Sequence, residues 1–182
     1  MNEQIVINDM RRSMAFVDKA KPILKRLFNG GEVMTVEGDD NQVCRMLDMT
    51  CGTDYFQIYS DKGLVWGVAS RVQNIKDGCK PYNTFTVRKA RESGAKTEYE
   101  KRQEAIKHGG LYPYLTMQGY VNTSGDILSI AIAKTTDIME FVEKGLAYEN
   151  HTRADKIGQA AFYVVDWRKF KTYGYKLIGW QR

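Results

Sequence analysis

The sequence predicts a mixed α/β, or α+β, fold with a mixed central β-sheet flanked by helices. Two observations carry this prediction. Helix-like and strand-like segments alternate along the chain, and turn signals at 60–63 and 123–126 each join two strand-like segments into a hairpin. At 182 residues, with 43% hydrophobic and 27% charged residues, the chain suits one domain with a substantial core. We therefore expect a single domain over residues 1–182.

The first half of the chain begins with apolar residues at helical spacing over 8–29. Pro22 lies inside this pattern and predicts either a kink or the start of a second helix. Runs rich in β-branched and aromatic residues, or with alternating polarity, predict the next elements. The expected strands are 33–37, 42–49, 53–59, 64–73 and 84–88.

In the second half, Thr97 and Glu100 have the spacing of a capping box and predict a helix that ends at Gly109. The apolar run ILSIAIA predicts a strand buried on both faces. The remaining expected elements are strands at 111–122, 127–134, 160–165 and 175–180 and a short helix at 137–145. We expect loops or turns at 146–159 and 166–174.

Strand alternation gives the hairpin 53–73 a distinctive face. A tight turn between its strands places Asp54 opposite Ala69, with Arg71 and Gln73 on the same face. A register shifted by two residues places Asp54 opposite Arg71 and leaves the facing sets unchanged. One acid and one cation therefore share a largely apolar face, and we expect this hairpin to be the functional centre.

The order helix, strand, Asp-bearing hairpin, helix and strand over residues 8–121 resembles the core of the PD-(D/E)XK nuclease superfamily. The resemblance implies a restriction-endonuclease-like core, in which an acid opens the second strand and an acid-x-Lys triplet follows on the third. The family's carboxylates bind Mg²⁺, and its Lys helps to orient or activate water. Here Asp54 holds the first position, but the triplet is Ala69-Ser70-Arg71. It lacks the acid, and Arg cannot act as a general base.

The resemblance implies a catalytic group of Asp54, Glu98, Arg71 and Gln73. Asp54 would bind Mg²⁺, and Glu98, at the start of a helix, or Asp48 would supply a second carboxylate. Arg71 would stabilise phosphate charge. Each of these acids also has an explanation without catalysis. Glu98 is favourable at a helix N-terminus, and Asp54 can form an ion pair with Arg71.

Basic residues are concentrated after the strand at 84–88, and the whole chain has net charge +5 and a pI near 9.0. Hydroxyl groups accompany them, as phosphate contacts require. The residues expected to bind nucleic acid are Arg88, Lys89, Arg91, Lys101 and Arg102. The alternative is a solvated helix face, because several glutamates dilute the charge.

Aromatic residues make up 12% of the chain. Such side chains stack on bases in some proteins and pack inside the core in most. The candidates for stacking are Trp66, Tyr112, Tyr114, Tyr120 and Trp167. Gln118 is a further candidate site residue, because strand alternation places it with Tyr114 and Tyr120.

The three cysteines lack a C-x-x-C spacing, which disfavours a disulfide framework and a structural zinc site. No apolar run predicts a signal peptide or a membrane span, so we expect a cytoplasmic protein with no membrane partner.

Three hypotheses about function follow. The first is a Mg²⁺-dependent endonuclease or a diverged relative that processes nucleic acid. The second is a non-catalytic accessory protein, as phages and mobile elements encode, that binds nucleic acid or a protein. The third is a structural subunit with an aromatic surface.

Overall fold

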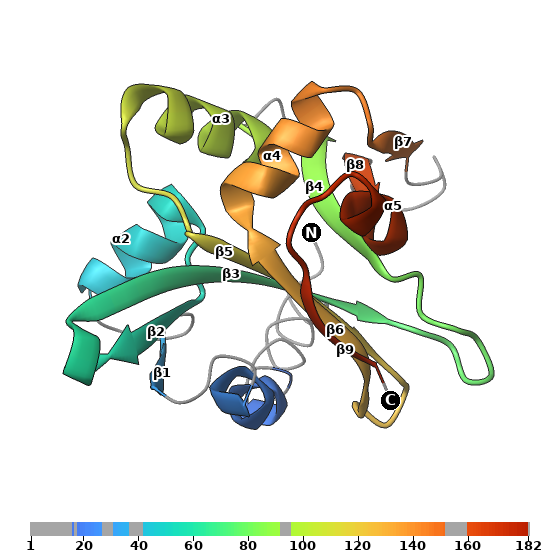
Figure 1. The fold of residues 1–182 in the computed structure, drawn as a ribbon, viewed down its shortest axis with the longest axis horizontal. Coiled ribbons are helices and arrows are strands. Elements are labelled where there is room, and N and C mark those ends of the chain that lie inside the picture. Colours follow the sequence, from blue (N-terminus) through green and yellow to red (C-terminus); the bar gives the residue numbers. More distant parts are fainter. Residues whose placement is uncertain are drawn as a thin grey trace.

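The computed structural model describes residues 16, 18–26, 31–36, 42–91, 96–151 and 160–181. These residues form a mixed α/β fold with two sheets (Figure 1). The larger sheet consists, in spatial order, of β1 (Glu32–Thr35), β2 (Tyr55–Tyr59), β3 (Leu64–Asn74), β5 (Leu115–Val121), β6 (Ile127–Lys134) and β9 (Ile178–Gln181). The smaller sheet consists of β4 (Thr84–Arg91), β8 (Ala160–Asp166) and β7 (Tyr148–His151). The prediction of one central sheet was therefore too simple, because β4 and β8 pair with each other outside it.

The helices are α2 (Gln42–Cys51), α3 (Glu98–His108), α4 (Thr135–Glu143) and α5 (Trp167–Thr172), and residues 16 and 18–26 are also helical. The predicted helix at 8–29 is confirmed over 18–26, where it continues through Pro22, and its remainder lies outside the described residues. The elements β7 and α5 occupy segments expected to be loops or turns. No described helix is long and apolar enough to span a bilayer.

The predicted strand at 42–49 was wrong, because this segment forms α2. Among the side chains of α2 that the structure describes, Cys44, Leu47 and Cys51 are partly buried, and their spacing of three and four residues defines one helix face. Val43 and Met46 are more than half exposed. An alternating pattern of apolar and polar residues over so short a segment therefore failed to separate a strand from a helix.

The β2–β3 hairpin has the predicted register, in which Tyr55 lies opposite Val68 and Tyr59 opposite Leu64. Asp54 comes immediately before β2. Its backbone N–H donates to the Val68 carbonyl at 2.9 Å, and its carboxylate accepts the backbone N–H of Ser70. These two bonds join Asp54 to the residues before and after Ala69, so Asp54 lies opposite Ala69 as predicted.

Strands β3 and β5 are parallel neighbours in the middle of the larger sheet. A parallel pair needs a long crossover connection, and here that connection carries β4 and α3. The predicted capping box is confirmed at the start of α3, where Thr97 and Glu100 exchange hydrogen bonds. Gly109, in the left-handed conformation, ends the helix.

The helix at 18–26 covers one face of the larger sheet, and α3, α4 and α5 lie on the other side with the smaller sheet (Figure 1). On the first face, Ala20 and Leu24 are fully buried against the sheet. The ring of Phe16 rests directly over Gly119 and leaves no room for a larger side chain there.

A second apolar cluster fills the space between the opposite face and the smaller sheet, and includes Phe85, Ile138, Phe141 and Phe170. The Tyr120 hydroxyl joins the two sheets, because it bonds to the backbone and the hydroxyl of Thr84.

Candidate functional site

Five polar side chains converge between β3, β5 and α3, and we call them the polar centre: Asp54, Arg71, Glu98, Arg102 and Gln118. The hairpin supplies the first two, α3 the next two and β5 the last. They lie on the side of the larger sheet that faces the smaller sheet, since Thr86 of β4 and Phe162 of β8 contact them. The crossover therefore brings α3 back onto the hairpin.

Glu98 binds two arginines. Its Oε2 lies 2.8 Å from Arg71 Nη2, its Oε1 lies 2.8 Å from Arg102 Nη1, and the backbone N–H of Arg88 donates to Oε2 at 3.3 Å. Burial of Glu98 by itself raises its pKa, but the charges of Arg102 and Arg71 outweigh burial, and the pKa lies below its ordinary value. The carboxylate is therefore held in its charged form.

Arg102 is the buried member of this network, with 5% of the residue exposed. Its Nη1 also donates to Thr116 Oγ1 at 3.3 Å, and Thr116 shares a hydrogen bond with Thr135 at the start of α4. Desolvation lowers the pKa of Arg102, and Glu98 opposes that effect. A guanidinium in this position holds α3 against β5 and does not form part of an exposed phosphate-binding surface.

Arg71 connects this network to the smaller sheet. Its guanidinium lies 5.2 Å from the centre of the Phe162 ring, and its Nη1 donates to Thr86 Oγ1 at 3.5 Å. Thr86 in turn donates to Gln118 Oε1 at 3.1 Å. Gln118 is 1% exposed, and its Nε2 has no hydrogen-bond partner among the described residues.

Mg²⁺ takes an octahedral set of oxygen ligands, and Glu98 as placed here does not offer it a free carboxylate oxygen. Both oxygens of Glu98 are committed to arginines, and no group of three or more His, Cys, Asp or Glu side chains is placed to hold a metal in the described part of the chain. Asp48 lies in α2, and its side chain is outside that part. We derive no metal-dependent step.

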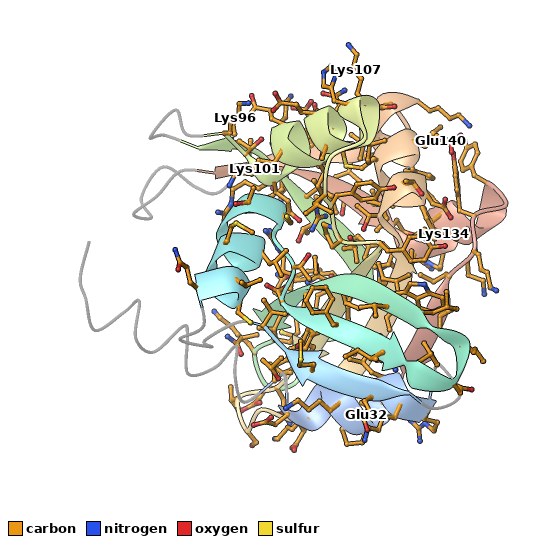
Figure 2. All side chains as sticks on the ribbon, turned by 90° about the vertical axis from the view of Figure 1, so that its left-hand side faces the viewer. Glu32, Lys96, Lys101, Lys107, Lys134 and Glu140 are labelled. Atoms are coloured by element: carbon orange, nitrogen blue, oxygen red, sulfur yellow. The ribbon has the colours of Figure 1, made fainter. Side chains whose placement is uncertain are left out.

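The other predicted site residues are dispersed. Gln73 lies on β3, and among the described residues no hydrogen bond joins it to the polar centre. Lys89 pairs with Glu149 of β7, and Lys101 is exposed on α3. Arg88 is partly buried with its guanidinium over Phe162. Arg91 ends β4, and its side chain is outside the described part. Figure 2 shows Lys96 and Lys101 near the start of α3 and Lys107 near its other end.

The aromatic candidates divide into two groups. Tyr120 and Trp167 are buried in the core, as most aromatic residues are. Tyr114 precedes β5, so strand alternation does not place it with Gln118. It packs on Trp66 across the opposite face of the sheet, with 5.6 Å between ring centroids.

Trp66 and Tyr114 belong to a surface cavity of about 340 Å³ that we call the aromatic groove. It lies at the end of the larger sheet, on the face that the helix at 18–26 also covers. Its lining consists of Tyr59, Lys62, Leu64, Trp66, Tyr114, Leu115, Ile132, Ala133, Lys134, Lys176 and Ile178. Three of these residues are aromatic, three are lysines, and none is acidic.

Sequence reasoning missed Tyr59 and the three lysines of the groove. Lys62 comes from the β2–β3 turn, Lys134 from the end of β6 and Lys176 from the segment before β9. Only the strand order brings these positions together, and no local spacing predicts it. No protein-family model, curated protein or solved structure matches the chain.

Proposed function

We propose that this protein binds nucleic acid without cleaving it, as a diverged relative of the PD-(D/E)XK nucleases. The observation that carries the proposal is the aromatic groove, which combines base-sized aromatic surfaces with lysines and has no acid among the lining residues that the structure describes. Lysines bind phosphate as mobile point charges. Among the described residues, Lys62, Lys134 and Lys176 form no ion pair, so their charge is available to a ligand.

The order of elements supports kinship with the nuclease fold. The helix at 18–26, β1, the β2–β3 hairpin, α3 and β5 follow the sequence of elements in that core, with α2 and β4 inserted. Asp54 keeps the position of the family's first acid. The pairing of Glu98 with Arg71 and Arg102 supports loss of metal-dependent cleavage, because the candidate second acid is already neutralised.

The test measures binding and cleavage separately. Fluorescence anisotropy with labelled DNA and RNA oligonucleotides, in a salt series, should give affinity that falls as salt rises. The triple variant Lys62→Ala, Lys134→Ala, Lys176→Ala should lower the salt slope by about 0.7–0.9 for each phosphate that is no longer neutralised. Lys107→Ala, on α3 and well apart from Lys134 (Figure 2), is the matched control and should bind like the wild type.

Cleavage of plasmid and of structured DNA with Mg²⁺ or Mn²⁺ should not occur. Divalent-dependent cleavage that Asp54→Ala abolishes would overturn the non-catalytic part and restore the nuclease hypothesis. Absence of both binding and cleavage would overturn the proposal as a whole.

A further inference from the structure

The three aromatic rings of the groove form one continuous surface. The Tyr59 and Trp66 rings meet edge to face with centroids 5.3 Å apart, and Tyr114 packs on Trp66 at an interplanar angle of 33°. Tyr59 is buried, and Tyr114 is outermost at 36% exposed. A ring already held by its neighbours loses little freedom when a ligand stacks on it, so Tyr114 is a prepared stacking platform.

The lysines surround this platform. The ammonium of Lys62 lies 5.2 Å from the Tyr59 ring centre, and that of Lys134 lies 5.8 Å from the Tyr114 ring centre. Lys176 stands on the wall formed by the segment before β9. Each side chain has a flexible stem, so its ammonium can leave a ring face for a phosphate while the ring takes a base.

The size of the groove limits what can enter. Its volume of about 340 Å³ is at the lower end of the range for small-ligand pockets, about 300–1,000 Å³. In a duplex the faces of the bases are stacked on one another, and only an unpaired base presents a free face. The floor of Leu115, Ile132 and Ile178 is apolar, which suits a base and not a sugar-phosphate backbone.

We infer that the groove binds single-stranded nucleic acid by stacking one unpaired base against Tyr114 and Trp66, while Lys62, Lys134 and Lys176 hold the adjoining phosphates. This inference rests on the proposed function and specifies its ligand. The charge of the lining favours this occupant, because the three lysines match an anionic strand and none of the described lining residues is acidic.

Three oligonucleotides of equal length test the inference: a single strand, the same strand in a blunt duplex, and an abasic strand that keeps every phosphate of the single strand. The single strand should bind most tightly, and the abasic strand should keep its salt slope while its affinity falls. Tyr114→Ala should raise the Kd for the single strand about 5- to 150-fold, the range expected for loss of one stacked base. Tyr114→Phe keeps the ring and should restore binding.

Tyr82→Ala is the matched control, because Tyr82 is 66% exposed and lies outside the groove. It should leave the Kd unchanged, and thermal melts should show that both alanine variants are folded. Equal affinity for all three oligonucleotides, or wild-type affinity in Tyr114→Ala, overturns the inference and leaves the proposed function standing. An acidic peptide of matched charge that displaces the single strand equally well also overturns it. Failure of every oligonucleotide to bind is a failure of the proposed function itself.

Discussion

Strand β3 carries Trp66 toward one face of the larger sheet and Arg71 toward the other. Trp66 belongs to the aromatic groove and Arg71 to the polar centre, and the positive charges of these two regions lie in different surroundings. In the polar centre, Arg71 and Arg102 are paired with Glu98; Arg102 is buried, and Arg71 is partly covered by Phe162 of β8. In the aromatic groove, exposed lysines surround the rings, and no described lining residue is acidic. Paired, enclosed cations contribute to folding, whereas cations at an open surface remain available for binding.

The comparison predicts that the two regions control different properties of the protein. Changes in the polar centre should lower the free energy of unfolding and leave the affinity for nucleic acid unchanged, as long as the protein is folded. Changes in the groove should do the reverse. Glu98→Gln and acid test the first half of this statement, and the groove variants test the second. Tyr120→Phe tests the separate contact between the two sheets.

The largest effect is expected for Glu98→Gln. This change leaves Arg102 buried without its charged partner, which typically costs about 3–5 kcal/mol of unfolding free energy. Urea unfolding followed by circular dichroism measures the loss. The matched control is Glu140→Gln, which breaks the exposed pair with Lys144 on α4 and should leave the urea midpoint unchanged. Equal midpoints for the wild type and Glu98→Gln would mean that the polar centre is not a stabilising network.

A smaller effect is expected for Tyr120→Phe. The Tyr120 hydroxyl accepts the Thr84 backbone N–H at 3.1 Å and donates to the Thr84 carbonyl at 2.8 Å. Without the hydroxyl these buried groups lose their partner, at a cost of about 1–3 kcal/mol. Urea unfolding should show this loss, and Tyr173→Phe, at an exposed tyrosine, is the control that should show none. An unchanged midpoint in Tyr120→Phe would mean that this hydroxyl does not hold the two sheets together.

The mildest perturbation is acid. The pKa of Glu98 is lowered in the folded protein, so its ionised form stabilises the fold above the unfolded-state pKa of about 4.3. That contribution is lost as the pH falls through the lower, folded-state pKa. The stability difference between the wild type and Glu98→Gln should therefore shrink below about pH 4.3. A difference that stays constant into more acidic solution would contradict the assigned pairing of Glu98.

Sequence patterns predicted the features that local chemistry determines. The turn after Tyr59 fixed the hairpin register, and the Thr97–Glu100 capping box fixed the start of α3. The face shared by Ala69 and Arg71 followed from alternation alone. These features depend on residues that are close together in the chain, so a single sequence is sufficient to reveal them.

Features that depend on contacts between distant parts of the chain could not be predicted from the sequence. An ion pair between Asp54 and Arg71 was the alternative to a catalytic role, but the ion pair of Arg71 is with Glu98, which reaches β3 only through the crossover. Burial of Arg102 depends on which face of α3 meets β5. The groove depends on the ends of five strands meeting, and α2 was missed because ten residues hold too few periods to identify a helix.

The pairing of β4 with β8 has a consequence for biosynthesis. During translation β4 leaves the ribosome well before β8 is made, so its backbone hydrogen-bonding groups must wait for a distant partner. Phe162, which covers the guanidinium groups of Arg71 and Arg88, arrives with β8. The guanidinium groups of Arg71 and Arg88 can therefore gain their aromatic cover only after β8 has been synthesised.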